Sequence, residues 1–452
     1  MFKRAINKQL KSWAESPDRK PLVLRGARQV GKTTAVEMFA KEYANYIYLN
    51  LENKKEAELF SKNLPVTDLY QAILLQKNMA PRSGKVLLFI DEIQFSPDAV
   101  RMLRYFYESL PEIHVIAAGS LLEVMAEQKN IDFPVGRVQF LFMYPLTFEE
   151  FLFATGETQA LQALQIIPLP EFSRQRLMEL FHVYAQIGGM PEIVARFAEK
   201  RDISSLKPYY QSLLMAFQDD AEKYARNSTL KHILRHCIES APLASGERIA
   251  FAGFGKSNYR SREVGEALRT LERAMLAYLL YPTTAWEIPL LPDLKKSPRL
   301  LFFDIGLLNF SAGLQGHFFE YPDLHSFYRG KLAEQIVGQE LLAGEMTVFK
   351  KPVFWVREKK QSNAEIDFLV PHERHVIPLE VKAGASGSLR SLHQFMGLCR
   401  SSYAVRLYAG RLEITTAATL EGKPFFLLNL PYFLTGKLRQ YLDWFLSEKP
   451  ET

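Results

Sequence analysis

The chain has 452 residues, 48% hydrophobic and 23% charged, which is the composition of a globular protein with room for about two to four domains. Its formal net charge of +6, from 56 basic and 50 acidic residues, permits an anionic partner such as nucleic acid without requiring one. Two cysteines and no apolar run of membrane-spanning length argue against secreted disulfide proteins and membrane proteins, so we expect a cytoplasmic location and no membrane partner.

The first region, residues 1–155, alternates short apolar runs with helical patterns, as a parallel sheet covered by helices requires. Near-continuous apolar runs are typical of strands that are buried on both faces. We therefore predict an α/β fold that begins with a parallel sheet. The expected strands are 21–25, 46–51, 86–90, 114–118 and 139–144, with helices such as 33–43 and 97–110 between them.

A glycine-rich segment follows the first strand and opens the first helix, and it matches the P-loop pattern G-x-x-x-x-G-K-[ST]. Backbone N–H groups of such a loop surround phosphate oxygens, and the helix N-terminus adds a favourable dipole. Lys32 is expected to reach the β- and γ-phosphates of ATP, and the Thr33 hydroxyl to coordinate Mg²⁺. The alternative is a glycine-rich turn with a solvated lysine. The predicted nucleotide-binding residues are Gly26, Ala27, Arg28, Gln29, Val30, Gly31, Lys32, Thr33 and Thr34.

An acid pair ends the apolar strand at 86–90 and supplies the second half of the predicted ATPase site. Asp91 would lie beside the Mg²⁺ ion, and Glu92 would orient and deprotonate the attacking water. Alone, an apolar run that ends in two acids can be a strand end with solvated carboxylates. Downstream of a P-loop, the catalytic interpretation is favoured.

Two further residues are candidates for the same site. Ser120, at the end of the strand 114–118, could hold the water or the γ-phosphate, or instead cap the next helix. Arg137 could neutralise transition-state charge in its own chain or in a neighbouring subunit, or it could be a solvated surface arginine.

Several segments resemble prokaryotic AAA-type ATPases that carry a C-terminal domain of unknown function with a restriction-endonuclease-like core. The resemblance implies Mg²⁺-dependent ATP hydrolysis and covers nearly the whole chain. The P-loop and acid-pair motifs are specific, whereas the later motifs indicate the family without indicating a chemistry. The segments are Gly-Ala-Arg-Gln-Val-Gly-Lys-Thr-Thr at 26–34, Ile-Asp-Glu-Ile-Gln at 90–94, Pro-Leu-Thr-Phe-Glu-Glu-Phe at 145–151, Gly-Gly-Met-Pro-Glu at 188–192, Tyr-Pro-Thr-Thr at 281–284 and Phe-Asp-Ile-Gly-Leu-Leu at 303–308.

The middle of the chain is predominantly helical by its apolar spacing. We predict a helical lid or connector over 156–245 and, together with the resemblance, a winged helix-turn-helix over 246–290. A helix over 261–280 is expected to bury an apolar stripe and to keep several arginines off it, where they could contact DNA. The alternative is an interdomain spacer whose arginines are solvated or paired with neighbouring glutamates. The stripe is Val264, Leu268, Leu271 and Met275; the arginines are Arg260, Arg262 and Arg269; the glutamates are Glu263, Glu266 and Glu272.

The last predicted domain, 325–440, is expected to be α/β, with a helix at 329–342 and strands at 353–356, 365–370 and 376–381. If the last two strands form a hairpin whose turn centres between residues 373 and 374, Asp367 faces Glu380. Two carboxylates roughly 5 Å apart destabilise a sheet unless a positive charge lies between them.

An ion of Mg²⁺ or Mn²⁺ would supply that charge, with Lys382 activating a water for attack on a phosphodiester and Glu334 completing the site. In these residues the segment resembles the PD-(D/E)xK nuclease core. The alternative is a cross-strand ion pair between Lys382 and Glu365, and a one-residue slip in register would also undo the Asp367–Glu380 pairing.

Together these patterns predict an ATPase that couples binding and hydrolysis of Mg-ATP to a C-terminal nuclease-like module, with nucleic acid as the expected target and a homo-oligomer as a compatible assembly. The alternative function is a nucleotide-dependent switch or scaffold that binds protein partners and never cleaves nucleic acid.

Overall fold

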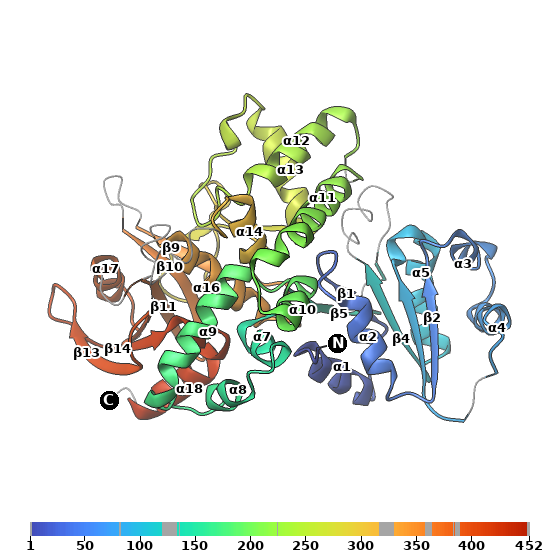
Figure 1. Cartoon of the computed structure of the whole chain (residues 1–452), viewed down its shortest axis with the longest axis horizontal. Helices are drawn as coiled ribbons and strands as arrows, with labels where there is room; N and C mark the ends of the chain where they lie inside the picture. Colours follow the sequence, from blue (N-terminus) through green and yellow to red (C-terminus); the bar gives the residue numbers. More distant parts are fainter. Residues whose placement is uncertain are drawn as a thin grey trace.

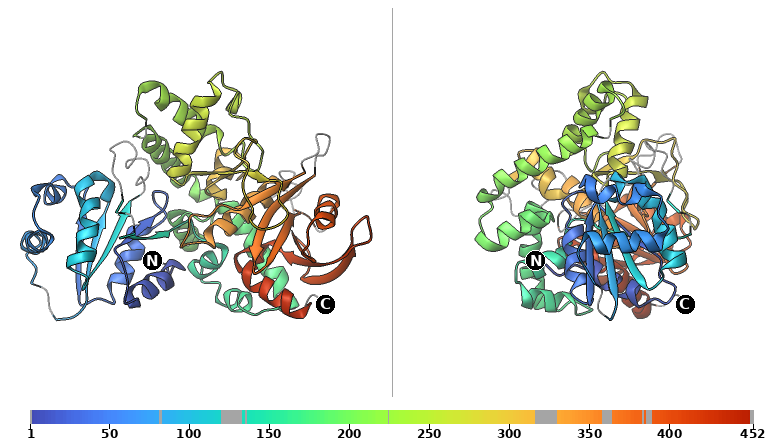
Figure 2. Two further views of the ribbon diagram at one scale, coloured as in Figure 1. Left: turned by 180° about the vertical axis from the view of Figure 1, so that it is seen from behind. Right: turned by 90° about the vertical axis from the view of Figure 1, so that its right-hand side faces the viewer.

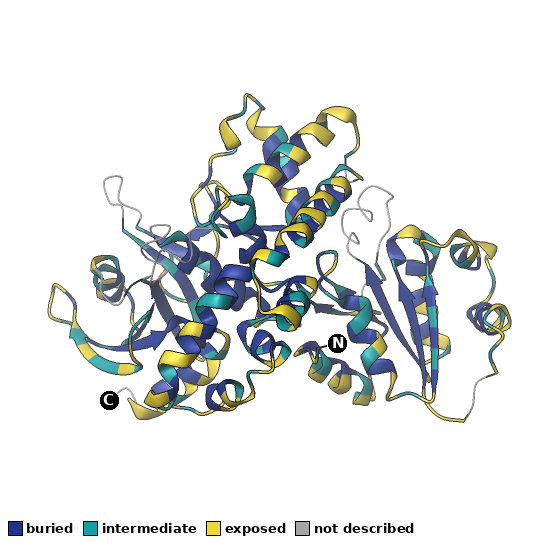
Figure 3. Cartoon of the chain, viewed as in Figure 1, coloured by how far each residue is buried: buried dark blue, intermediate teal, exposed yellow. Residues whose placement is uncertain are grey.

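A computed structural model of the chain places two β-sheets at opposite ends of the molecule, with helices of the middle region between them (Figures 1 and 2). The helices that face solvent carry exposed residues on one side only, and the strands of both sheets are largely buried (Figure 3). The structure describes residues 2–80, 83–119, 133–134, 136–223, 225–315, 330–357, 364–382, 384 and 389–449.

The N-terminal sheet is parallel, with the strand order β2–β3–β4–β1–β5. All five predicted strands are confirmed, with each end within two residues of the expected position. Their bounds are β1 (Leu22–Arg25), β2 (Asn45–Asn50), β3 (Val86–Asp91), β4 (Ile113–Gly119) and β5 (Gln139–Phe142).

Helices cover both faces of this sheet, which is why its central strands are apolar on both sides. One face packs against α1 (Ile6–Glu15) and α2 (Lys32–Ala40), and the other against α4 (Val66–Gln76) and α5 (Pro97–Ser109).

The middle region is mainly helical, as predicted, but it also contains the antiparallel strand pair β6 (Ala277–Leu280) with β8 (Arg299–Phe302) and the short strand β7 (Pro282–Thr283). The helix predicted over 261–280 was too long: α13 ends at Arg273, and the following apolar residues form β6. A short apolar run cannot be assigned to a buried helix or a buried strand from spacing alone. The helices are α7 (Phe148–Ala154), α8 (Thr158–Leu164), α9 (Arg174–Ile187), α10 (Pro191–Lys200), α11 (Lys207–Lys223), α12 (Ser228–Ser240), α13 (Ser261–Arg273) and α14 (Ile305–Ser311).

The C-terminal sheet is mixed, with the order β13–β14–β12–β11–β10–β9–β7. The three predicted strands correspond to β9, β10 and β11, and the predicted helix to α16 (Lys331–Ala343). α17 (Arg390–Leu398) packs on one face, and α16 and α18 (Leu438–Glu448) pack on the other. The strands are β7 (Pro282–Thr283), β9 (Val353–Val356), β10 (Glu365–His372), β11 (His375–Val381), β12 (Tyr403–Tyr408), β13 (Glu413–Ala418) and β14 (Pro424–Pro431).

One continuous apolar core joins the regions. It runs from α1 through the middle helices to α18, and β7, from the range expected to form a winged helix, pairs with β9 of the C-terminal sheet. The backbone N–H of Phe142 also donates to the carbonyl of Met346 at 2.7 Å. Within the described ranges, no helix combines the length and the apolar character needed to cross a bilayer.

Candidate functional site

The predicted P-loop connects the C-terminal end of β1, which lies between β4 and β5 in the parallel sheet, to the first turn of α2. Gly31 caps α2 with φ of 93°, a left-handed conformation that side chains other than glycine rarely adopt. The N–H groups of the first helical turn have no partner within the helix. With the helix dipole, these N–H groups form an anion-binding position at the end of β1.

Lys32 is buried within this loop and lies where the sequence predicted it. Its Nζ donates to the carbonyl oxygens of Gly26 at 2.9 Å and Ala27 at 2.8 Å. Burial lowers the pKa of Lys32 to about 8, although the nearby carboxylates of Glu92 and Asp91 act in the opposite direction. The ammonium group is therefore held inside the loop by neutral carbonyls and keeps its charge available for an anion.

Asp91 ends β3 beside the P-loop, as predicted. The Thr33 hydroxyl donates to Asp91 Oδ2 at 2.7 Å, and Asp91 Oδ1 accepts the backbone N–H of Glu92 at 3.0 Å. A hydroxyl and a carboxylate are the oxygen ligands that Mg²⁺ takes from a protein when phosphates and waters supply the rest. These two side chains fit a Mg²⁺ ion that accompanies ATP.

Glu92 follows Asp91 in a left-handed backbone conformation, with φ of 51°. Burial raises the pKa of its carboxyl group, while a hydrogen bond from the Gln94 amide lowers it. The Gln94 side chain is itself 2% exposed. The Ile-Asp-Glu-Ile-Gln motif contained Gln94, but sequence reasoning gave it no role; the structure shows that it holds the glutamate expected to act as the base.

The two additional candidates for the nucleotide site are Ser120 and Arg137. Ser120 lies outside the described residues. Arg137 pairs through Nε with Glu108 of α5 at 2.9 Å and lies two residues before β5, at the amino edge of the parallel sheet. The P-loop lies at the opposite, carboxyl edge, so Arg137 does not reach the nucleotide site of its own chain.

Two arginines that sequence reasoning did not connect to other regions hold the P-loop in place. Arg28, expected only to line the loop, binds both carboxylate oxygens of Asp220 in α11, at 2.5 and 2.6 Å. This hydrogen bond is the largest cause of the raised pKa of Arg28. Arg4 donates to the P-loop carbonyl of Val30 at 2.8 Å and to the carboxylate of Glu150 at 2.8 Å.

Three family motifs without predicted chemistry meet in one buried junction. Leu146, from the motif at 145–151, donates its N–H to the carbonyl of Gly189 at 2.7 Å. The N–H of Gly189 donates in turn to Asp304 Oδ2 at 2.7 Å. A Cβ atom on Gly189 would lie 2.2 Å from the Leu146 carbonyl oxygen, which explains the glycine. These motifs therefore join the end of the N-terminal sheet to the middle helices.

Glu340 of α16 extends the junction into the C-terminal domain. Its Oε1 accepts the backbone N–H of Phe148, the first residue of α7, at 2.9 Å and the Tyr184 hydroxyl at 2.8 Å. Burial raises the pKa of Glu340 to about 7. The helix that contacts α7 through Glu340 is thus the helix that also carries Glu334.

The C-terminal hairpin has the predicted register. His372 pairs with His375 and Phe368 with Leu379, which brings Asp367 to the strand position opposite Glu380. Asp367 Oδ2 accepts the N–H of Val381 at 2.7 Å. Lys382 binds Glu380 Oε1 at 2.7 Å, so its predicted alternative pairing with Glu365 is wrong.

A buried arginine, which the sequence did not single out, lies among the predicted metal ligands. Arg299 contacts Glu334 at 3.2 Å and Asp367 at 3.6 Å, and it also pairs with Glu365. Burial and the neighbouring carboxylate of Asp367 raise the pKa of Glu334 to about 8. Burial raises the pKa of Glu380 to about 7. Among the described side chains, no group of three or more His, Cys, Asp and Glu residues is arranged to hold a metal ion.

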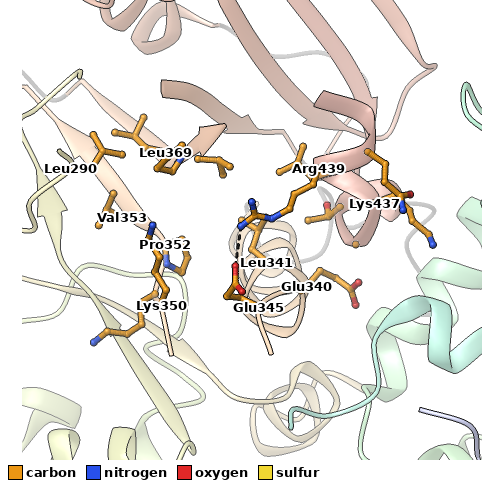
Figure 4. Close-up of a pocket in the computed structure, with 18 of the residues that line it drawn as sticks. Leu290, Glu340, Leu341, Glu345, Lys350, Pro352, Val353, Leu369, Lys437 and Arg439 are labelled. Carbon is orange, nitrogen blue, oxygen red and sulfur yellow. Dashed lines mark hydrogen bonds and ion pairs between the residues drawn. The ribbon is translucent and has the colours of Figure 1, made fainter. Parts of the chain in front are cut away.

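A separate cavity of about 560 Å³ lies between α16, β9 and the start of α18. Figure 4 shows Leu290, Val353 and Leu369 along one side, with the Arg439 side chain reaching across to Glu345. That ion pair measures 2.9 Å. The cavity contains none of the predicted site residues, and its wall includes Glu340 of the junction.

Comparisons with known protein families divide the chain into three parts. Residues 18–152 match a family described as an AAA domain. Residues 178–317 and 329–426 match two families that are each described as a domain of unknown function. No curated protein matches the chain.

Solved structures with similarity to the chain include the following three. The Walker-type ATPase PABY2304 of Pyrococcus abyssi is 15% identical, with a TM-score of 0.43, over 69% of this chain and 96% of that chain. The Aeropyrum pernix Orc1 protein in complex with DNA is 13% identical, with a TM-score of 0.29, over 68% and 90%. AMPPCP-bound DnaA from Aquifex aeolicus is 13% identical, with a TM-score of 0.27, over 59% and 87%.

The family match and the site geometry concern the same residues. The segment 18–152 contains the P-loop, Asp91 and Glu92, and in the structure these surround one anion-binding position at the carboxyl edge of a parallel sheet. The N-terminal region is therefore an AAA-type P-loop domain, followed by two regions that match domains of unknown function.

Proposed function

We propose that the chain binds Mg-ATP at the P-loop and hydrolyses it. The observation that carries the proposal is the hydrogen bond between Thr33 and Asp91, next to the buried ammonium group of Lys32. Lys32 and the N–H groups of the α2 terminus would bind the phosphates, and Thr33 and Asp91 would hold Mg²⁺. When bound, Mg²⁺ neutralises charge on the phosphate oxygens. Glu92, with its raised pKa, would accept the proton of the attacking water.

We further propose that the nucleotide state is transmitted to the rest of the chain. Arg28 links the P-loop to α11 through Asp220, and Arg4 links the P-loop to α7 through Glu150. From α7, the N–H of Phe148 bonds to Glu340 of α16. This continuous set of bonds supports coupling, which requires two states of the chain that both sites bias.

The finer assignments of the middle and C-terminal regions are also proposals. A winged helix is supported by the succession of α12, α13 and the antiparallel strands β6 and β8. A role on DNA is supported by the exposed side chains of Arg260, Arg262 and Arg269. A restriction-endonuclease-like core is supported by the hairpin that brings Asp367 opposite Glu380. Arg137 is proposed only as a contributor to the site of a neighbouring subunit.

The test of the ATPase proposal is the turnover of Mg-ATP by Lys32→Ala, with Lys41→Ala as the control because Lys41 is an exposed lysine directly after the same helix. We expect Lys32→Ala to lose turnover by about two orders of magnitude or more, since it removes the charge at the transferred phosphate. Lys41→Ala should behave as wild type. Equal turnover by both variants would refute the nucleotide assignment.

A second candidate function, metal-dependent cleavage of nucleic acid, is favoured by one observation: the hairpin register brings Asp367 to the strand position opposite Glu380. Incubation of wild type, Asp367→Ala and Lys382→Ala with DNA and RNA in Mg²⁺ or Mn²⁺ tests it. Cleavage that needs both residues would establish the nuclease. No cleavage by wild type on any substrate would favour the non-cleaving switch.

A further inference from the structure

Arg299 lies among four acidic residues of the C-terminal region, Glu334, Glu365, Asp367 and Glu380, which we call the acidic cluster. Its charged group is more deeply buried than any of these four. Its side chain is 4% exposed. One Nη atom lies 3.2 Å from Glu334 Oε2, and the other lies 3.6 Å from Asp367 Oδ1 and pairs with Glu365. The same guanidinium donates to the backbone carbonyl of Asp367 at 3.2 Å. Glu334 and Asp367, the expected metal ligands on two different elements, therefore already share one cation.

The position of Arg299 is determined by the surrounding structure and is not a chance side-chain orientation. The last residue of the same strand, Phe302, is bound to α16: the Gln335 amide donates to the Phe302 carbonyl at 2.6 Å. The N–H of Phe302 donates to the Ser245 hydroxyl at 2.9 Å. The guanidinium also lies over the Phe354 ring of β9, 4.9 Å from the centroid. Because Gln335 directly follows Glu334, the bonds that hold β8 also fix Arg299 against this carboxylate.

A divalent ion bound by both Glu334 and Asp367 would compete with Arg299, which contacts Glu334 Oε2 and Asp367 Oδ1, while Asp367 Oδ2 already accepts the N–H of Val381. It would lie within a few ångströms of a guanidinium that is charged at all accessible pH values, and like charges at that separation repel strongly in a buried site. Mg²⁺ also requires near-ideal octahedral geometry, which carboxylates already held by a planar guanidinium cannot rearrange to provide. The residues present therefore do not fit the metal that the nuclease-like pattern implies.

We propose that Arg299 is the resident cation of the acidic cluster, and that Arg299 and a divalent metal ion exclude each other from it. The C-terminal core then uses the carboxylates of a nuclease-like pattern to hold β8 of the middle region against α16 and β10. Cleavage of nucleic acid by this core would first require β8 to withdraw.

The test counts bound Mn²⁺ by electron paramagnetic resonance in nucleotide-free full-length protein and follows thermal unfolding with and without millimolar Mn²⁺. The variants are Arg299→Met, which removes the charge at similar length, and Arg299→Lys, which retains a charge. Asp91→Asn and Asp367→Asn assign any bound ion to the P-loop or to the acidic cluster. We expect wild type and Arg299→Lys to show no Mn²⁺ that depends on Asp367. We expect Arg299→Met to bind one Mn²⁺ ion that depends on Asp367. Its Tm should be several degrees higher with Mn²⁺ than without it.

Two results would overturn the proposal. The first is Mn²⁺ bound by wild type and lost in Asp367→Asn but not in Asp91→Asn. The second is a folded Arg299→Met protein that gains no ion. If Arg299→Met does not fold, the wild-type measurement still decides, because it needs no variant at Arg299. None of these readouts depends on ATP turnover, so failure of the ATPase proposal would be seen separately.

Discussion

The nucleotide site and the acidic cluster contain the same ingredients, a buried cation beside several carboxylates, in opposite arrangements. At the P-loop, Lys32 donates to two neutral carbonyls, and the carboxylates of Asp91 and Glu92 bond to a hydroxyl and an amide. In the acidic cluster, Arg299 is paired directly with the carboxylates. The first arrangement leaves both signs of charge available to Mg-ATP, whereas in the second the guanidinium is already engaged by three of the carboxylates.

A motif therefore predicts which side chains meet but not which of them remain available to a ligand. Carbonyl partners hold a lysine without cancelling its charge. In a buried ion pair the two charges compensate each other, and removing one partner leaves the other buried and unpaired.

Replacing Arg299 by Met should give the largest loss of stability. It leaves the carboxylates Glu334, Glu365 and Asp367 without their shared cation, and breaking a buried pair of this kind costs about 3–5 kcal/mol. Arg248→Met is the control, since Arg248 is half-exposed and lies 3.7 Å from Glu365, where about 1 kcal/mol or less is expected. Urea unfolding measures both at pH 7. Equal destabilisation by the two variants would show that Arg299 contributes no more to stability than an exposed arginine does.

Replacing Glu92 by Gln should slow ATP turnover about 10²–10³-fold, because an amide cannot accept the proton of the attacking water. Nucleotide affinity and Tm should change little, since Gln94 can still bond to the side chain. The contrasting variant is Glu365→Gln, in the acidic cluster, which should leave turnover unchanged. Turnover assays and nucleotide titration compare the two variants. A loss of turnover in Glu365→Gln but not in Glu92→Gln would contradict the assignment of Glu92 as the base.

The acidic cluster should make the protein less stable as pH rises. The pKa of Glu334 is raised to about 8, above its unfolded value of 4.5, so the folded state binds the proton more tightly. This stability is fully present below pH 4.5 and is lost as pH rises through about 8, by up to about 1.4 kcal/mol per pH unit. Glu334→Gln, which resembles the protonated form, should flatten the dependence. The midpoints of urea unfolding from pH 5 to 8 provide the measurement. The same pH dependence in wild type and Glu334→Gln would contradict this assignment to Glu334.

Nucleotide affinity should fall above about pH 8. Burial lowers the pKa of Lys32 to about 8, so its positive charge is present below that value and is lost above it. Bound phosphate raises the pKa again, so we expect a loss of about tenfold between pH 7 and 9. Titration with a fluorescent nucleotide measures it, and Lys32→Arg, which stays charged, should lose this pH dependence. Identical profiles would exclude Lys32 as the titrating group.

Replacing Asp220 by Asn should have the smallest effect, since Arg28 is 40% exposed in its side chain and solvent screens the pair. We expect a change of a few-fold in ATP turnover. If Asp220 couples the P-loop to α11, ATP should slow amide exchange in α11 of wild type, and that protection should be lost in Asp220→Asn. Protection that persists in the variant would remove Arg28 from the coupling.

Much of the fold could be predicted because the signals were local. Apolar strands buried on both faces, such as 86–90, and the turn between residues 373 and 374 are encoded by neighbouring residues, and the structure agrees. The end of α13 could not be predicted, since the apolar residues that follow become a strand only by pairing with β8, more than twenty residues later. The partners of Arg28 and Gly189 were equally invisible, because they lie on segments distant in sequence.

By itself, the sequence determined the P-loop, the acid pair at the end of β3 and the hairpin that carries Asp367 and Glu380, since each depends on short-range spacing and strand periodicity. Only the tertiary structure decided that Arg137 lies at the far edge of the sheet and that Arg299 enters the acidic cluster. Electrostatic interactions depend on distance in space and on burial, and neither can be read from separation along the chain.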